Sequence, residues 1–134
     1  MKFLTLLGAA LIGSAVAGGC VAPCAYWDTV PYDTAAGNNV RGEDNLVDGY
    51  DNSVDGLIND IAGNNNRVRG EGNGVRGDLN SILGAFNRVS GNQNAVNGDD
   101  NRIKGNSNAV LGYSNGIYGD YNKITGEYNG IEGF

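Results

Sequence analysis

The sequence contains no histidine, only two cysteines, two prolines and a single tryptophan among its 134 residues. Without histidine, the side chain that most often transfers protons near neutral pH is missing. The serines therefore have no imidazole base, and the carboxylates keep no regular spacing that would pair a general acid with a general base. We expect no enzymatic activity, no cofactor and no bound metal ion.

Long apolar runs and an excess of positive charge are also missing. The apolar stretch 3–12 is too short to span a bilayer as a helix, and no later stretch is long enough to do so. Fifteen acidic residues against nine basic ones give a net charge of −6, which favours solubility and disfavours general binding to nucleic acids. We therefore expect no membrane span and no nucleic-acid partner.

Residues 1–17 have the features of a secretory signal peptide. Lys2 is followed by the apolar stretch 3–12, and Ala15-Val16-Ala17 forms a cleavage site. We therefore predict that the protein is secreted and extracellular. A bacterial lipoprotein site ending at Cys20 is the alternative, although alanine stands where such sites normally have leucine.

Residues 18–36 separate this signal from the rest of the chain and contain both cysteines. After export, Cys20 and Cys24 are expected to form one local disulfide, since two thiols without histidine do not make a zinc site. Tyr26, Trp27 and Tyr32 are expected to cover the open N-terminal end of the domain that follows, because repeat arrays need caps at their ends.

A heptad repeat runs without a break through residues 37–134 and accounts for most of the 23 glycines. Glycine occupies positions 42, 49, 56, 63, 70, 77, 84, 91, 98, 105, 112, 119, 126 and 133. Asparagine occupies positions 38, 45, 52, 59, 66, 73, 80, 87, 94, 101, 108, 115, 122 and 129. Valine or isoleucine follows two residues after each asparagine, from Val40 to Ile131. This strict register indicates a repeat architecture rather than a low-complexity chain.

The repeat does not have the composition of a coiled coil. A coiled-coil heptad has two apolar positions and good helix formers elsewhere, whereas this one has a single apolar column beside glycine and asparagine. In a strand, by contrast, the segment N-x-[V/I]-x-G places all three repeated residues on one face. Each such five-residue strand is followed by a two-residue corner, where residues of almost any type are expected to be tolerated.

Two heptads should close one flattened coil, with valine and isoleucine from opposite strands meeting inside. The predicted fold class is therefore all-β, a parallel β-solenoid of about seven coils, each fourteen residues long. An inward asparagine without a hydrogen-bond partner would cost about 1–3 kcal/mol. We therefore predict stacked asparagine ladders, one of which contains Asn66, Asn80, Asn94 and Asn108.

The N-x-[V/I]-x-G motif at seven-residue spacing resembles the ice recrystallisation inhibition proteins of cold-hardy grasses, and it is similar to the heads of trimeric bacterial adhesins. The resemblance covers residues 37–134 and implies a left-handed parallel β-roll without catalytic residues. For the grass proteins it also implies ice binding through outward threonine and serine. This chain departs from that pattern, because Thr125 is the only threonine in its repeat.

The outward positions suggest two binding surfaces. A basic face would contain Arg76, Arg88, Arg102 and Lys104, and its guanidinium groups would suit an anionic glycan or an acidic protein surface. The alternative is a flatter, uncharged face formed by Ala95, Asn97, Ala109 and Leu111, which is where we would place affinity for ice.

Seven apolar or aromatic corner residues are expected to be exposed, because the predicted interior has no place for them. They are Leu57, Ile58, Leu79, Phe86, Tyr113, Tyr121 and Tyr128. Such residues are either ordinary exposed surface or a contact edge. Self-association through one end of the solenoid is a further expectation, because only Phe134 follows the last repeated glycine.

The sequence thus favours a secreted, non-enzymatic solenoid that binds a surface, a glycan or a host protein in the manner of an adhesin or effector. Ice binding with inhibition of recrystallisation is the first alternative. A purely structural extracellular or cell-wall protein is the second.

Overall fold

The computed structural model describes residues 32–33 and 37–133, and this part of the chain is all-β. The predicted signal peptide and the Cys20–Cys24 disulfide lie outside the described residues. One sheet contains β1 (Tyr32–Asp33), β3 (Leu46–Asp48), β5 (Asp60–Ala62), β7 (Gly74–Arg76), β9 (Arg88–Ser90), β11 (Arg102–Lys104), β13 (Gly116–Tyr118) and β15 (Gly130–Glu132). The other sheet contains β2 (Asn39–Arg41), β4 (Ser53–Leu57), β6 (Arg67–Glu71), β8 (Ser81–Leu83), β10 (Ala95–Asn97), β12 (Ala109–Leu111) and β14 (Lys123–Thr125).

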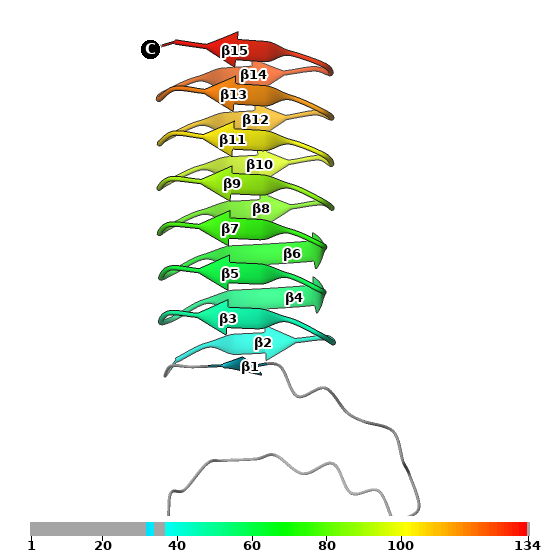
Figure 1. Cartoon of the computed structure of the whole chain (residues 1–134), viewed down its shortest axis with the longest axis vertical. Helices are drawn as coiled ribbons and strands as arrows, with labels where there is room; N and C mark the ends of the chain where they lie inside the picture. The colour runs from blue at the N-terminus through cyan, green and yellow to red at the C-terminus, as the bar shows by residue number, and fades with distance from the viewer. Residues whose placement is uncertain (1–31, 34–36, 134) are drawn as a thin grey trace, which may run out of the picture.

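The strands wind into a parallel β-solenoid of fourteen residues per coil. Successive strands alternate between the odd-numbered and the even-numbered sheet, and each pairs in parallel with the strand one coil away. Val89 lies beside Ile103, for example, and Val96 lies beside Val110. Figure 1 shows the strands of each sheet stacked along the long axis. The odd-numbered strands run in one direction and the even-numbered strands in the opposite one. The fold class and coil length predicted from the heptad are therefore confirmed. Among the described residues, no helix is long and apolar enough to cross a membrane.

The core consists of two rows of aliphatic side chains, one from each sheet, that pack against each other. Its fully buried members, all at most 4% exposed, are Val47, Val54, Ile61, Val68, Val75, Ile82, Val89, Val96, Ile103, Val110, Ile117 and Ile124. Val40 and Ile131 pack on the two ends of this core and are partly buried. Such a thin core buries little apolar surface per residue, so polar interactions must contribute to the stability of the coil.

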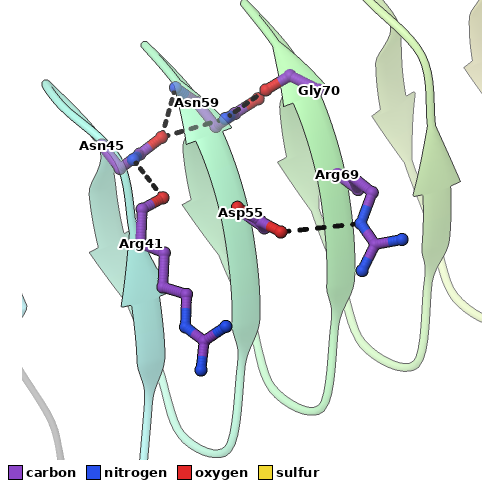
Figure 2. Close-up of polar contacts among 6 residues, drawn as sticks. All are labelled: Arg41, Asn45, Asp55, Asn59, Arg69 and Gly70. Atoms are coloured by element: carbon purple, nitrogen blue, oxygen red, sulfur yellow. Dashed lines mark hydrogen bonds and ion pairs between the residues drawn. The ribbon is translucent and has the colours of Figure 1, made fainter.

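Buried asparagines form two continuous ladders along the core. The backbone N–H and the Nδ2 of Asn59 both donate to Oδ1 of Asn45, one coil earlier, at 3.0 and 2.9 Å. The Nδ2 of Asn59 also donates to the carbonyl of Gly70 at 2.9 Å (Figure 2). Each inner amide therefore donates two hydrogen bonds and accepts two, which is its full capacity. No buried side-chain polar atom within the described residues lacks a partner.

The same ladders explain why most strands contain three residues rather than the five that the sequence pattern predicts. The backbone N–H of each ladder asparagine donates to a side-chain oxygen instead of a neighbouring strand's carbonyl, as Asn94 does to Oδ1 of Asn80 at 3.0 Å. At the other end of the strand, glycines such as Gly98 adopt a φ of 141°, which is not a strand conformation. Regular pairing is therefore confined to the three residues centred on each valine or isoleucine.

The column glycines from Gly42 to Gly119 are each required by a carbonyl of the next coil. A Cβ added to Gly56, which has a φ of 146°, would lie 1.8 Å from the carbonyl oxygen of Gly70. That oxygen is also the acceptor for the Nδ2 of Asn59. The glycine and asparagine columns are thus interdependent, because the asparagine needs an inward carbonyl and that carbonyl leaves no room for a side chain on the glycine below.

A second residue of every corner has a positive φ, and here the sequence often lacks glycine. The residue before each ladder asparagine has a φ of 54–60° in twelve non-glycine cases. Among them are Ile58, Leu79, Phe86 and two tyrosines, although this left-handed region costs L-residues about 1–2 kcal/mol and is least suited to β-branched chains. The heptad pattern does not predict this second position, because its residue type varies from corner to corner.

The carbonyl stack leads to a prediction for Gly91. Its Cβ would lie 1.9 Å from the carbonyl oxygen of Gly105, so Gly91→Ala should lower the free energy of unfolding by at least about 3 kcal/mol. Gly116→Ala is the matched control, because Gly116 points outward with nothing within 4 Å of its Cβ position. Urea unfolding followed by circular dichroism measures both variants. Equal unfolding midpoints would contradict the steric account.

The ladder leads to a second prediction. Asn87→Ala removes four hydrogen bonds that the Asn87 side chain makes with Asn73, Gly98 and Asn101. Because buried polar groups left unpaired cost about 1–3 kcal/mol each, we expect the free energy of unfolding to fall by at least about 3 kcal/mol. Thermal unfolding provides the measurement. The control is Asn97→Ala, an exposed asparagine, which should change stability by less than about 0.5 kcal/mol. A loss as small for Asn87 as for Asn97 would show that the ladder contributes no net stability.

The strained corners lead to a third prediction. Ile58→Asn should raise the free energy of unfolding by about 1 kcal/mol, because asparagine tolerates a φ near 56° and little apolar burial is lost from a side chain that is 60% exposed. Asp100→Asn, at an equivalent position that already carries a tolerant residue, should leave the urea midpoint unchanged. A destabilised Ile58→Asn variant would mean that Ile58 makes a stabilising contact larger than its strain.

Candidate functional site

The solenoid offers four surfaces on which a site could be built: the outer faces of the two sheets and the two edges formed by the corners. In every three-residue strand the central side chain points into the core and the two flanking ones point outward. Parallel pairing in fixed register stacks these outward residues into two columns on each sheet. Any site is therefore defined by residues fourteen apart in the sequence.

The flat face is the outer surface of β8, β10 and β12. One of its columns contains Ser81, Ala95 and Ala109, and the other contains Leu83, Asn97 and Leu111. The short side chains of the first column lie beside the longer ones of the second, so that a shallow, mainly apolar groove crosses the three strands and extends onto β14. The structure thus brings together the four residues predicted from the sequence, Ala95, Asn97, Ala109 and Leu111, and extends their surface by Ser81 and Leu83.

The basic face lies on the opposite sheet, over β7, β9 and β11. Arg88 pairs directly with Arg102, and Lys104 pairs with Ser90, which in turn pairs with Arg76. The four predicted residues are therefore neighbours on three consecutive strands. No ion pair joins any of these four residues to a carboxylate among the described residues.

The other three arginines, Arg41, Arg67 and Arg69, lie on the even-numbered sheet, and Arg69 has a different environment from the basic face. Arg69 lies 3.6 Å from Asp55 on the adjacent strand, through Nε and Oδ2 (Figure 2). Both side chains are more than half exposed, so this ion pair contributes little to stability. Its effect is to neutralise one positive charge at the border of the flat face.

One edge of the solenoid carries an outer ladder that the sequence analysis did not predict. The residues that follow the column glycines there accept a hydrogen bond from the backbone N–H one coil earlier: Asn64 from Tyr50, Asp78 from Asn64, Asn92 from Asp78, Asn106 from Asn92, and Asp120 from Asn106. We call this the polar edge. The sequence does contain a signal for this ladder, namely asparagine or aspartate at every fourteenth residue from 64 to 120. A search for a seven-residue repeat misses it, because such a search combines the corners of both edges.

The opposite edge, which we call the apolar edge, has only one such bond among its described residues, from the N–H of Ala85 to Asp99. Its exposed apolar and aromatic residues are Leu57, Ile58, Phe86, Tyr113 and Tyr128. The same corners also carry exposed acidic residues, among them Glu43, Glu71 and Glu127. The two remaining predicted corner residues, Leu79 and Tyr121, are exposed on the polar edge. All seven are thus exposed, as the sequence predicts. On the polar edge the outer ladder accounts for the asparagine and aspartate that recur every fourteen residues.

Within the described residues no three acidic or cysteine side chains come close enough together to hold a metal ion. The grooves over the two sheets are open depressions, lined by the outward residues of adjacent strands and by backbone. A ligand that lies along several coils would meet outward residues at the spacing of adjacent strands, because successive coils are in register.

Comparison with curated proteins and with solved structures gave no match. A family model described as the grass antifreeze beta roll matches residues 34–133, which are 100 of the 134 residues of the chain. This match supports the resemblance drawn from the heptad. It also favours ice binding over the adhesin-like and structural interpretations, which the comparisons do not support. Because the match covers all strands from β2 to β15, the protein belongs to the grass antifreeze beta roll family.

Proposed function

We propose that the protein binds ice through the flat face and thereby inhibits ice recrystallisation. Family membership supports this function over the surface-binding one that the sequence favours. The activity is one of adsorption, without a chemical step, and it needs no cofactor. A protein adsorbed on a crystal blocks the addition of water molecules where it sits.

The observation that carries the proposal is the absence of charge on the flat face. Within the described residues, β8, β10 and β12 are the only three consecutive strands of either sheet whose outward residues are all uncharged. Arg67 and Arg69 on β6 border this surface at one end, and Lys123 on β14 borders it at the other. Long charged side chains hold their own hydration water, so an ice-binding surface is expected to exclude them.

The flat face is also held rigidly. Its strands are bonded to both neighbours at the usual spacing of about 4.7–4.9 Å, and the ladder amides fix the backbone at the start of each strand. Alanine and serine lose little rotamer freedom on binding. A rigid, regularly spaced surface matches a rigid lattice with a small entropic cost, which is the advantage that preorganisation gives to any binding site.

The composition of the flat face suits contact with ordered water. Methyl groups of Ala95, Ala109 and Leu111 supply apolar area, while Asn97 and Ser81 supply hydrogen-bonding groups that can join the lattice. The patch covers only three strands. We therefore expect modest adsorption rather than coverage of an extended crystal plane.

We also propose that the protein acts outside the cell, where ice crystals grow. The support for this location is the signal-peptide pattern of residues 1–17. Detection of the mature chain in the medium of an expressing cell would test it, and retention inside the cell would contradict it.

Ala109→Lys tests the assignment of the flat face. A charged side chain on β12, directly beside Ala95 of the central strand, should raise the concentration needed for half-maximal inhibition of recrystallisation by about tenfold or more, equivalent to about 1.4 kcal/mol of adsorption free energy. The matched control is Ala62→Lys, which makes the same change at an outward position of the opposite sheet. Ice recrystallisation assays on both folded variants provide the measurement. Equal losses, or none in Ala109→Lys, would remove the flat face from the proposal.

A further inference from the structure

We propose that the basic face is a second binding site, for a linear acidic polysaccharide that carries regularly spaced carboxylate or sulfate groups. This inference does not depend on ice binding, because it concerns the opposite sheet. It rests on the stacking of four cations, on an open hollow between them, and on the position of the nearby carboxylates.

The cations are concentrated by the register of the sheet. Arg88 and Arg102 occupy the same column on adjacent strands, about 4.7–4.9 Å apart at the backbone. Arg76 and Lys104 occupy the other column, on either side of Ser90. Like charges placed directly beside each other destabilise a sheet, and none of these four residues has an ion-pair partner among the described residues. An anion bound between them would relieve this repulsion.

Small residues between the arginines open a hollow at the surface. Gly74 pairs with Arg88, and Arg76 pairs with Ser90, so that on β7 and β9 the two arginines lie on one diagonal and the two small residues on the other. The hollow is lined by Gly74, Ser90 and both arginines, with Asp60 at its far side. A carboxylate or sulfate placed there can be approached by two guanidinium groups, the side chains best suited to bidentate binding of such anions.

A neighbouring depression continues towards the apolar edge. It is lined by Phe86, Gly72, Arg88, Asp100 and Arg102, among others. The ring of Phe86 lies over Gly72, since a Cβ on that glycine would approach the ring carbons to 2.8 Å. An aromatic side chain beside charged and hydrogen-bonding groups is a surface on which the ring of a sugar can pack. The carboxylates of Asp60 and Asp100 are then placed to accept hydrogen bonds from its hydroxyl groups.

The other carboxylates around this face are partly engaged by the backbone. Oδ1 of Asp78 accepts the N–H of Asn64 at 2.7 Å, and Oδ1 of Asp99 accepts the N–H of Ala85 at 2.6 Å. These bonds hold both side chains at the edges of the coil, away from the cation columns. The arginines therefore remain available to an external anion even though the chain as a whole has a net charge of −6.

The surface fits a polysaccharide better than a folded protein partner. Stable protein interfaces are built around apolar anchors in a desolvated centre. Between residues 74 and 104, however, the outward positions of the basic face are glycine, arginine, serine and lysine. The face also opens towards Gly116 on β13, which gives a chain-like ligand room to run along the axis of the solenoid.

The two proposed sites lie on opposite sheets of the same coils. The basic face covers β7 to β11, and the flat face covers β8 to β12. A protein held on an acidic polysaccharide by the first would therefore present the second to solvent. Attachment and ice adsorption can then occur together, with no exchange of ligands at a shared surface.

The test is binding of the folded protein to dextran sulfate and to polygalacturonate, with neutral dextran as the blank, measured by affinity electrophoresis at low and at physiological salt. The double variant Arg88→Ala/Arg102→Ala should weaken binding to at least one acidic glycan by about tenfold or more. The matched control Arg67→Ala/Arg69→Ala removes the same two charges from the other sheet and should bind like the unaltered protein. Binding to dextran sulfate alone identifies sulfate as the anion, and binding to polygalacturonate alone identifies carboxylate.

Three results would overturn the inference. Absence of binding to both acidic glycans is one, and equal weakening by the two double variants is another, since it would show a net-charge effect. The third is binding of polyglutamate as tight as that of the glycans, because it would show a general affinity for polyanions. The Arg88→Ala/Arg102→Ala variant should inhibit ice recrystallisation as well as the unaltered protein does. Polysaccharide binding thus tests the basic face alone, and the ice assay tests the flat face alone.

Discussion

The structure depends on the need to satisfy every hydrogen bond of an asparagine buried in a core only two side chains across. Asparagine meets this need with a short side chain, because its one amide offers two donors and a carbonyl oxygen that accepts two bonds. Aspartate in the same column would stack negative charges in a dry interior at the spacing of adjacent strands. The Asn59 amide, bonded to Asn45 and Gly70, shows the complete arrangement. The repeated glycine, the short strands and the tight corners all follow from it.

Because the interior is held by the repeated residues, the outward positions are free to vary. The aliphatic, asparagine and glycine columns occupy three residues of every heptad, and the outward residues beside them contribute little to the fold. One solenoid can therefore carry an uncharged surface on β8 to β12 and a basic surface on β7 to β11 of the opposite sheet. The proposals for ice and for an acidic polysaccharide use these two surfaces without competing for residues.

The corners show where the fold tolerates a cost. On the polar edge, side chains such as Asp78 and Asn92 bond the backbone of the adjacent coil and reinforce the inner ladder from outside. On the apolar edge, bulky residues such as Ile58 and Phe86 are held at a positive φ while they remain exposed. These exposed apolar side chains gain no burial, and their backbone is held in an unfavourable conformation. Such positions are where departures from local preference tend to mark function rather than folding.

The sequence by itself determined the architecture, since a period of seven with asparagine, valine or isoleucine, and glycine places the repeated residues on one face of a strand and lets two strands enclose one thin apolar core. It also determined which residues share a face, because register follows from the period. Only the tertiary structure decided that the carbonyl of Gly70 excludes a side chain at Gly56, that a second residue of each corner has a positive φ, and that the two edges differ. These features arise from contacts between neighbouring coils, where the backbone of one turn limits the space and the hydrogen bonds of the next, and a linear pattern does not contain those distances.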